Sequence, residues 1–147
     1  MKLYLSNNPT KKTFTGLMDF AFSASDTFQL VVRKDLGLSK KGKKLLKRLE
    51  PWLIKKKKQS EWASNILFEG KAWVYYFKAT KGAKAILLNE LASLYELEQS
   101  DYPEDLSFFR KGRIVIATNS HEQFCMVVKK SKQLQAFLAI PNIRFSH

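Results

Sequence analysis

The chain has 147 residues, a length that suits one globular domain, and its 45% hydrophobic and 13% aromatic content excludes a wholly disordered chain. No apolar run approaches the roughly 20 residues that a membrane-spanning helix needs, and residues 1–16 lack the apolar core of a secretory signal. We therefore expect a cytoplasmic protein, and its formal net charge of +13 indicates an anionic partner.

The positive charge is unevenly distributed. Residues 1–60 carry 15 Lys or Arg and 4 Asp or Glu, a net +11, whereas residues 61–109 carry 4 and 8, a net −4. Residues 110–147 carry 7 and 1, a net +6. A field of this kind attracts polyanions or anionic membrane surfaces, and the 21 Lys against 5 Arg favour loose, salt-sensitive attraction over the forked recognition that Arg provides.

The first third of the chain predicts a short strand, a helix, a second strand and a second helix. The short strand covers residues 2–5, and Thr13 is the expected N-cap of the first helix. Alternating apolar residues predict a strand over residues 26–34. Ser39 caps the next helix, and Pro51 ends it because proline lacks a backbone donor.

Two lysine clusters flank this second helix and are the candidate polyanion-binding residues. They are Lys40, Lys41, Lys43 and Lys44, then Lys55, Lys56, Lys57 and Lys58. Lysines release counterions from a phosphate backbone, and Trp52 or Trp62 would stack on bases. The ordinary interpretation is a solvated helix face followed by a charged loop. No helix-turn-helix, zinc-finger or RNA-recognition motif accompanies the clusters, so nucleic-acid binding would be non-specific.

The second half predicts more strand than helix. Residues 66–69 predict a short strand that forms a hairpin with a strong strand over residues 72–80. Thr80 caps the longest predicted helix, which runs to about Glu98. Three β-rich segments at about 106–128 then predict an antiparallel meander, and a short helix and an edge strand follow it.

The mixed order of these segments disfavours a parallel, doubly wound sheet. We predict a single α+β domain over residues 1–147, with a mainly antiparallel sheet and three or four helices packed on it. The C-terminal three-stranded meander at about 106–128 carries apolar residues on both faces, for example Ile114 and Val115, so both faces should be covered.

The polar side chains best able to do chemistry fall at one end of the meander. Glu104 and Asp105 precede its first strand, and His121 and Glu122 lie in the turn between its second and third strands. These positions share one end of a meander, so the four side chains can converge. The ordinary interpretation is that they are solvated turn and cap residues.

Several chemistries lack their motifs. The chain has no glycine-rich phosphate loop, no nucleophile elbow and no internal repeat. Two His and one Cys have no metal-ligand spacing, so no metal and no cofactor is predicted. We interpret the single cysteine, Cys125, as a small buried hydrophobe rather than a nucleophile, and it excludes an internal disulfide.

The leading hypothesis is a non-enzymatic binding or interaction module whose basic faces steer an acidic protein or another polyanion. Its recognition surface would be lined by Glu61, Trp62, Glu104, Asp105, His121 and Glu122. One alternative is a small hydrolase or nuclease-like enzyme that uses the carboxylates and His121, with Mg²⁺ as the metal that such ligands suit. The other is non-specific nucleic-acid binding through the lysine clusters.

Four segments together resemble a family of small bacterial proteins of similar length that has no established activity. They are residues 26–33, Ser60-Glu61-Trp62, residues 103–109 and Ser120-His121-Glu122. The resemblance spans residues 14–128 and implies no catalytic residue or cofactor. Such proteins tend to have Pro and Gly after Glu-Trp, where this chain has Ala63-Ser64.

Overall fold

In the computed structural model, residues 1–67, 69–128 and 130–147 are described, and within these ranges the chain forms ten strands and four α-helices. The strands are β1 (Lys2–Leu5), β2 (Thr27–Arg33), β3 (Leu53–Gln59), β4 (Glu61–Trp62), β5 (Asn65–Ile66), β6 (Ala72–Lys78), β7 (Glu104–Arg110), β8 (Arg113–Asn119), β9 (Phe124–Val128) and β10 (Phe145–Ser146). The helices are α1 (Lys11–Ala24), α2 (Lys40–Leu49), α3 (Lys81–Glu90) and α4 (Leu134–Leu138), with short 3₁₀ turns η1 (Glu50–Trp52), η2 (Leu94–Glu96) and η3 (Ser131–Gln133).

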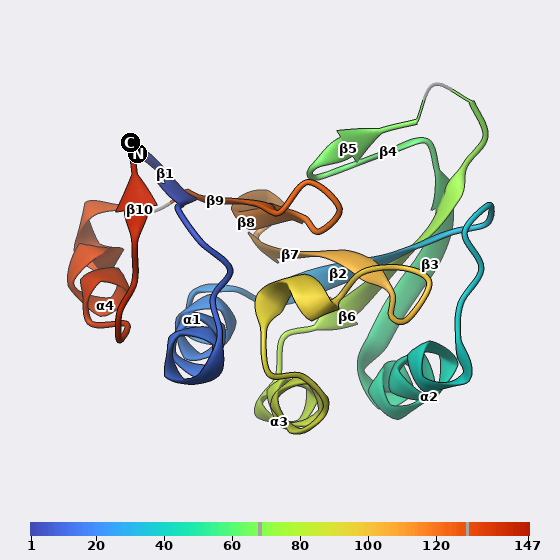
Figure 1. The fold of residues 1–147 in the computed structure, drawn as a ribbon, viewed down its shortest axis with the longest axis horizontal. Coiled ribbons are helices and arrows are strands. Elements are labelled where there is room, and N and C mark those ends of the chain that lie inside the picture. Colours follow the sequence, from blue (N-terminus) through green and yellow to red (C-terminus); the bar gives the residue numbers. More distant parts are fainter. Residues whose placement is uncertain (68, 129) are drawn as a thin grey trace.

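Eight of these strands form one antiparallel sheet in the order β10-β1-β9-β8-β7-β2-β6-β3, and β4 and β5 form a separate hairpin. Helices α1, α3 and α2 lie side by side on one face of the sheet, and the β4–β5 hairpin lies on the other (Figure 1). The predicted α+β class, the antiparallel sheet and the meander β7–β8–β9 are confirmed. Among the described helices, none combines the length and the apolar character needed to cross a bilayer.

Strand alternation sends apolar side chains to both faces of the sheet, as the sequence predicted. Phe28 and Leu30 of β2 are fully buried in the large core beneath the helices. Val31 of the same strand points the other way and packs with Val74 and Trp62 in a smaller cluster under the hairpin. The hairpin therefore covers this part of the second face, and Trp62 is its buried side chain there.

Capping residues and a proline determine where several of the helices begin and end. The cap predicted for α2 is confirmed, because Ser39 Oγ accepts the backbone N–H of Gly42 at 3.2 Å and the helix ends at Leu49, before Pro51. Helix α1 begins earlier than predicted, with Thr10 rather than Thr13 at its N-cap. The hydroxyl of Thr13 instead donates to the carbonyl of Pro141 at 2.6 Å.

The longest helix was predicted to run to about Glu98, and this extension is wrong. Thr80 caps α3 as predicted, but the helix ends at Glu90. Ser93 and Glu96 form a capping box, with Glu96 Oε1 accepting the backbone N–H of Ser93 at 2.8 Å. A capping box begins a new helical turn, here η2, and so separates it from α3. The apolar residues after the box are still buried in the core, but they are not part of α3.

The predicted pairing around residue 66 is also wrong. Strand β5 pairs with β4 rather than with β6, and β6 instead lies between β2 and β3. Phe68, inside the strand predicted over residues 66–69, lies outside the described residues. The lysines of residues 55–58 form the edge strand β3 and not a charged loop.

Candidate functional site

A β-bulge at the start of β7 buries two neighbouring carboxyl groups. Gln29 of β2 pairs with Ser107, but Val31 pairs with Glu104 instead of Asp105, so β7 carries one additional residue there. Asp105 takes up this residue with a positive φ of 56°, a conformation that Asp tolerates better than most residues. As a result Glu104 and Asp105 are only 2% and 1% exposed, although strand neighbours normally face opposite sides.

Asp105 joins three separate segments through hydrogen bonds. The indole Nε1–H of Trp62 donates to its Oδ2 at 2.8 Å, and the backbone N–H of Ser120 donates to its Oδ1 at 2.9 Å. The backbone N–H of Asp105 in turn donates to the Ser120 hydroxyl at 3.1 Å. The carboxyl group therefore fastens the β4–β5 hairpin and the β8–β9 turn to the bulge.

Glu104 lies in a site that favours its neutral form. Burial and the neighbouring charge of Asp105 raise the pKa of Glu104 from 4.5 to about 7, while the Arg33 guanidinium opposes this rise. Burial also raises the pKa of Asp105, against the lowering effect of its hydrogen bonds from Ser120 and Trp62. Glu104 is therefore the carboxyl group of the pair that gains a proton as the pH falls through about 7.

The other predicted site residues lie at the surface. His121 is exposed, and its Nδ1 lies 3.0 Å from Glu98 Oε1, although the ring is close enough to lower the pKa of Glu104. Glu61 and Glu122 are exposed and, within the described residues, form no hydrogen bond with the buried pair. Of the predicted residues the structure thus brings together Trp62, Glu104 and Asp105, with His121 nearby.

The buried pair lies apart from three hollows of the surface. Neither Glu104 nor Asp105 is among the residues that line these hollows, of about 550, 780 and 270 Å³. In the part of the chain that the structure describes, no three His, Cys, Asp or Glu side chains are grouped to hold a metal ion. Cys125 is 1% exposed, and burial raises the pKa of its thiol to about 12, so it is protonated at neutral pH.

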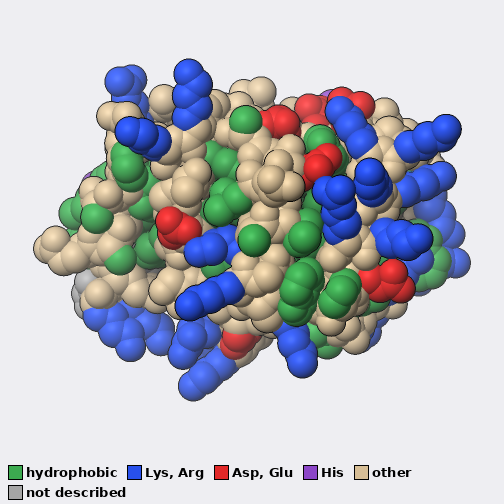
Figure 2. Space-filling view, turned by 90° about the horizontal axis from the view of Figure 1, so that it is seen from below, with side chains coloured by type: hydrophobic (Ala, Val, Ile, Leu, Met, Phe, Trp, Pro, Cys, Tyr) green, Lys and Arg blue, Asp and Glu red, His purple; other side chains and the backbone are tan. Residues whose placement is uncertain are grey.

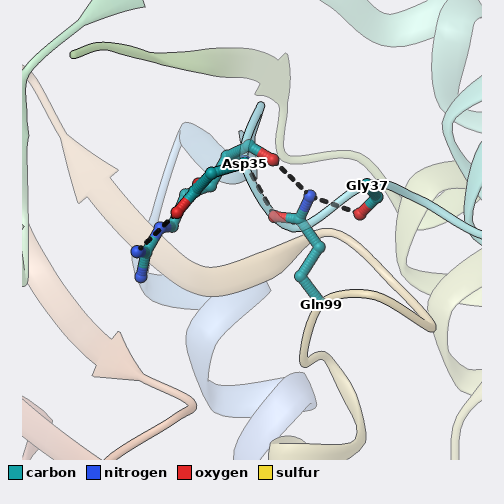
Figure 3. A network of polar contacts seen from close by, with 4 residues as sticks. Asp35, Gly37 and Gln99 are labelled. Atoms are coloured by element: carbon teal, nitrogen blue, oxygen red, sulfur yellow. Dashed lines mark hydrogen bonds and ion pairs between the residues drawn. The ribbon is translucent and has the colours of Figure 1, made fainter.

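A glutamine that sequence reasoning missed secures the segment after β2. Gln99 Oε1 accepts the backbone N–H of Arg33 at 2.7 Å, and its Nε2 donates to the carbonyls of Arg33 and Gly37 at 2.7 and 2.6 Å (Figure 3). The side chain thus supplies hydrogen bonds to Arg33 of β2, which lies beyond the last residue of β2 that pairs with β7, Val31 opposite Glu104. Arg33, fixed in this way, bonds Asp35 at 3.4 Å and directs its charge toward the carboxyl pair.

A second candidate site lies at the β3 edge of the sheet, where lysines cover aromatic rings. The ammonium of Lys56 lies 4.3 Å from the ring centre of Trp73 and 5.1 Å from that of Tyr75. Those of Lys58 and Lys34 lie 5.0 and 5.5 Å from Trp73. We call Lys34, Lys56, Lys58, Trp73 and Tyr75 the lysine–aromatic surface.

Strand pairing explains this surface. Lys56 is paired with Tyr75 and Lys58 with Trp73, so these four side chains share one face of the β3–β6 ladder. Lys55, paired with Tyr76, lies on the opposite face, 4.8 Å from the Tyr76 ring centre. Sequence reasoning missed Trp73 and Lys34, because it did not predict β3 and therefore could not predict the pairing of its lysines with β6.

The lysines of α2 extend the positive charge at the same end of the molecule. Lys40, Lys41, Lys43 and Lys44 are all exposed, and Lys41 alone among them has an ion pair within the described residues, at 3.9 Å from Asp101. Lys and Arg side chains crowd the end of the molecule that α2 and β3 form (Figure 2). The tryptophans predicted to stack on bases lie elsewhere. Trp62 is buried, and Trp52 packs against Gly82 of α3.

No protein-family model, no curated protein and no solved structure matches this chain. Function is therefore inferred from the geometry of the two sites.

Proposed function

We propose that the protein is a non-enzymatic module that binds single-stranded nucleic acid through the lysine–aromatic surface. The observation that carries this proposal is the position of three ammonium groups within 5.5 Å of the Trp73 ring centre, with no carboxylate paired to any of them in the described residues. Lysines attract a phosphate backbone, and aromatic rings stack on bases of any sequence.

The charge on α2 supports a role beyond keeping the sheet edge soluble. Lysines on an exposed edge strand prevent edge-to-edge aggregation, which is a sufficient reason for some of the lysines on β3. It does not account for the four lysines near the start of α2, a helix with no acidic residue in its first turn. Positive charges there oppose the helix dipole by roughly 0.3–1 kcal/mol each, so a compensating role is expected.

The composition of the surface favours single strands and low sequence preference. Lys supplies point charges rather than the planar forks with which Arg reads guanine edges. Trp73 and Tyr75 lie partly exposed among the lysines, and only unpaired bases can stack on such rings. A cytoplasmic location, expected from the sequence, is part of this proposal.

An acidic protein is the competing partner. Replacing Trp73 distinguishes it from nucleic acid, because only bases are expected to stack on this ring. We would measure binding of a fluorescent 20-nucleotide oligothymidylate and of a polyglutamate peptide of equal charge, by anisotropy. The proposal predicts tighter binding of the oligonucleotide. It also predicts that Trp73→Leu weakens oligonucleotide binding by roughly 5- to 100-fold, the effect of one lost base stack, and changes peptide binding little.

Trp73→Phe is the matched control, because it keeps an aromatic face at the same position of β6. It should retain most of the oligonucleotide affinity that Trp73→Leu loses. Equal affinity of the wild-type protein for the peptide and the oligonucleotide, unchanged in both variants, would show that the basic surface recognises charge alone and would favour an acidic protein partner.

A further inference from the structure

A hollow of about 780 Å³ opens next to the lysine–aromatic surface. It lies where β2 and β3 end and β6 begins, and six charged residues contribute to its lining: Arg33, Lys34, Asp35, Lys58, Glu69 and Lys71. Four of these are cations and two are carboxylates, so the hollow carries an excess of positive charge. Its other lining residues, Leu67 and Gly70, carry no charge.

Two of the cations are close neighbours without a counter-charge. Lys34 and Lys58 both line the hollow and both lie over the Trp73 ring, 5.5 and 5.0 Å from its centre, and the neighbouring Lys58 lowers the pKa of Lys34. Neither lysine has an ion pair within the described residues, and Asp35 is engaged by Arg33 at 3.4 Å. The Nε of Arg33 is itself buried without a hydrogen-bond partner, so Asp35 does not satisfy that guanidinium fully.

We propose that this hollow binds the terminal phosphate monoester of a nucleic-acid strand, with Lys34 and Lys58 as its principal ligands. The inference rests on the proposed function and deepens it by naming the strand end as the group recognised. A monoester carries a charge of about −1.5 to −2 near neutral pH, whereas an internal diester carries about −1. A single monoester can therefore neutralise both adjacent ammonium groups, whereas a single internal diester can neutralise only one.

The position of the hollow fits a strand end. Lys56 and Lys58 lie on one face of β3, two residues or about 6.6 Å apart, and the row reaches the hollow at Lys58. A strand whose bases lie on Trp73 and Tyr75 would follow Lys56 toward Lys58 and place its end group in the hollow. Lys34 and Lys58 belong to both sites, because each also lies over the Trp73 ring.

The test compares three hexathymidylates that differ only at their ends: 5′-phosphorylated, 3′-phosphorylated, and hydroxyl at both ends. We expect one phosphorylated form to bind the wild-type protein about tenfold or more tightly than the hydroxyl form, as charge-assisted hydrogen bonds provide. Inorganic phosphate in millimolar excess should remove this preference. The double variant Lys34→Gln/Lys58→Gln should bind all three oligonucleotides equally.

The matched control is Lys55→Gln/Lys57→Gln, which removes the same charge from the opposite face of β3. It should lower affinity for all three oligonucleotides and keep their ratio. Equal binding of the three by the wild-type protein would overturn the phosphate site and leave the proposed function intact.

A direct probe distinguishes failure of the phosphate site from failure of the proposed function. Thymidine monophosphate is titrated while the side-chain resonances of Lys34 and Lys58 are followed by NMR. Shifts in both lysines without oligonucleotide binding would support the phosphate site and refute the proposed function. Unshifted lysines at millimolar ligand would refute the phosphate site by themselves.

Discussion

The proton on Glu104 makes a sharp prediction about stability and pH. Glu104→Gln keeps the shape of the side chain but removes its ability to ionise. The carboxyl group is 2% exposed beside Asp105, and its pKa rises from 4.5 to about 7 in the folded protein. A raised pKa means that Glu104 stabilises the fold below about pH 4.5, and that this contribution is lost as the pH rises through about 7.

The size of the effect follows from the two pKa values. A shift from 4.5 to about 7 corresponds to roughly 3 kcal/mol, at about 1.4 kcal/mol per unit. Above pH 8 the wild-type protein must bury an ionised Glu104 that the Gln variant lacks. Glu104→Gln should therefore raise the free energy of unfolding by about 2–3 kcal/mol at pH 8.5 and change it by less than about 1 kcal/mol at pH 4.5.

Urea unfolding followed by tryptophan fluorescence at pH 4.5, 6.5 and 8.5 measures this directly. Asp105→Asn is the matched control, because both Asp105 oxygens accept N–H donors, at 2.8 and 2.9 Å, and an amide would set an NH₂ against one of them. It should destabilise by about 1–3 kcal/mol at pH 6.5 and 8.5. A Glu104→Gln variant that is destabilised equally at all three pH values would refute the protonated Glu104.

Three further substitutions test the contacts around both sites. Trp62→Phe removes the hydrogen-bond donor to Asp105 and should lower the free energy of unfolding in urea by about 1–3 kcal/mol at pH 7.5 and by less at pH 4. An equal loss at both pH values would contradict an ionised Asp105 as the acceptor. Gln99→Leu removes three bonds to the segment after β2 and should accelerate hydrogen exchange of the Arg33 amide selectively; uniform exchange across β2 would argue against it. Gly82→Ala should lower the melting temperature despite the better helix propensity of alanine, because its Cβ would overlap the Trp52 ring; a higher melting temperature would contradict that packing.

Patterns of apolar residues predicted the elements that bury a face. Strand β2 and the meander alternate clearly, and Ser39 and Pro51 mark the cap and the stop of α2. Strand β3 has no such signal, since Lys55–Lys58 present charge to both sides of an edge strand. Helix α3 was predicted too long because its apolar residues continue past Glu90, and only the Ser93–Glu96 capping box stops it.

The candidate sites were harder to predict than the fold. Glu104 and Asp105 were predicted to lie at one end of the meander, but their burial depends on the bulge at Asp105, and a bulge is a property of strand pairing rather than of local sequence. In the sequence, Trp73 is one of several aromatic residues of β6. Only its pairing with Lys58 of β3 distinguishes it from the others. In both places the tertiary pairing of strands, which no single segment encodes, determines which side chains meet.

The salt dependence of oligonucleotide binding tests the lysine–aromatic surface most directly. For a single strand the plot of log K against log salt concentration has a slope of about −0.7 per phosphate neutralised. Replacing Lys34, Lys56 and Lys58 with Gln should make this slope shallower by up to about 2. The matched control removes equal charge at the opposite end of the molecule, from Lys2 of β1, Lys12 of α1 and Lys132 of η3 (Figure 1), and should leave the slope unchanged within about 1. A control variant that flattens the slope as much as the Lys34/Lys56/Lys58 variant would contradict binding at the lysine–aromatic surface.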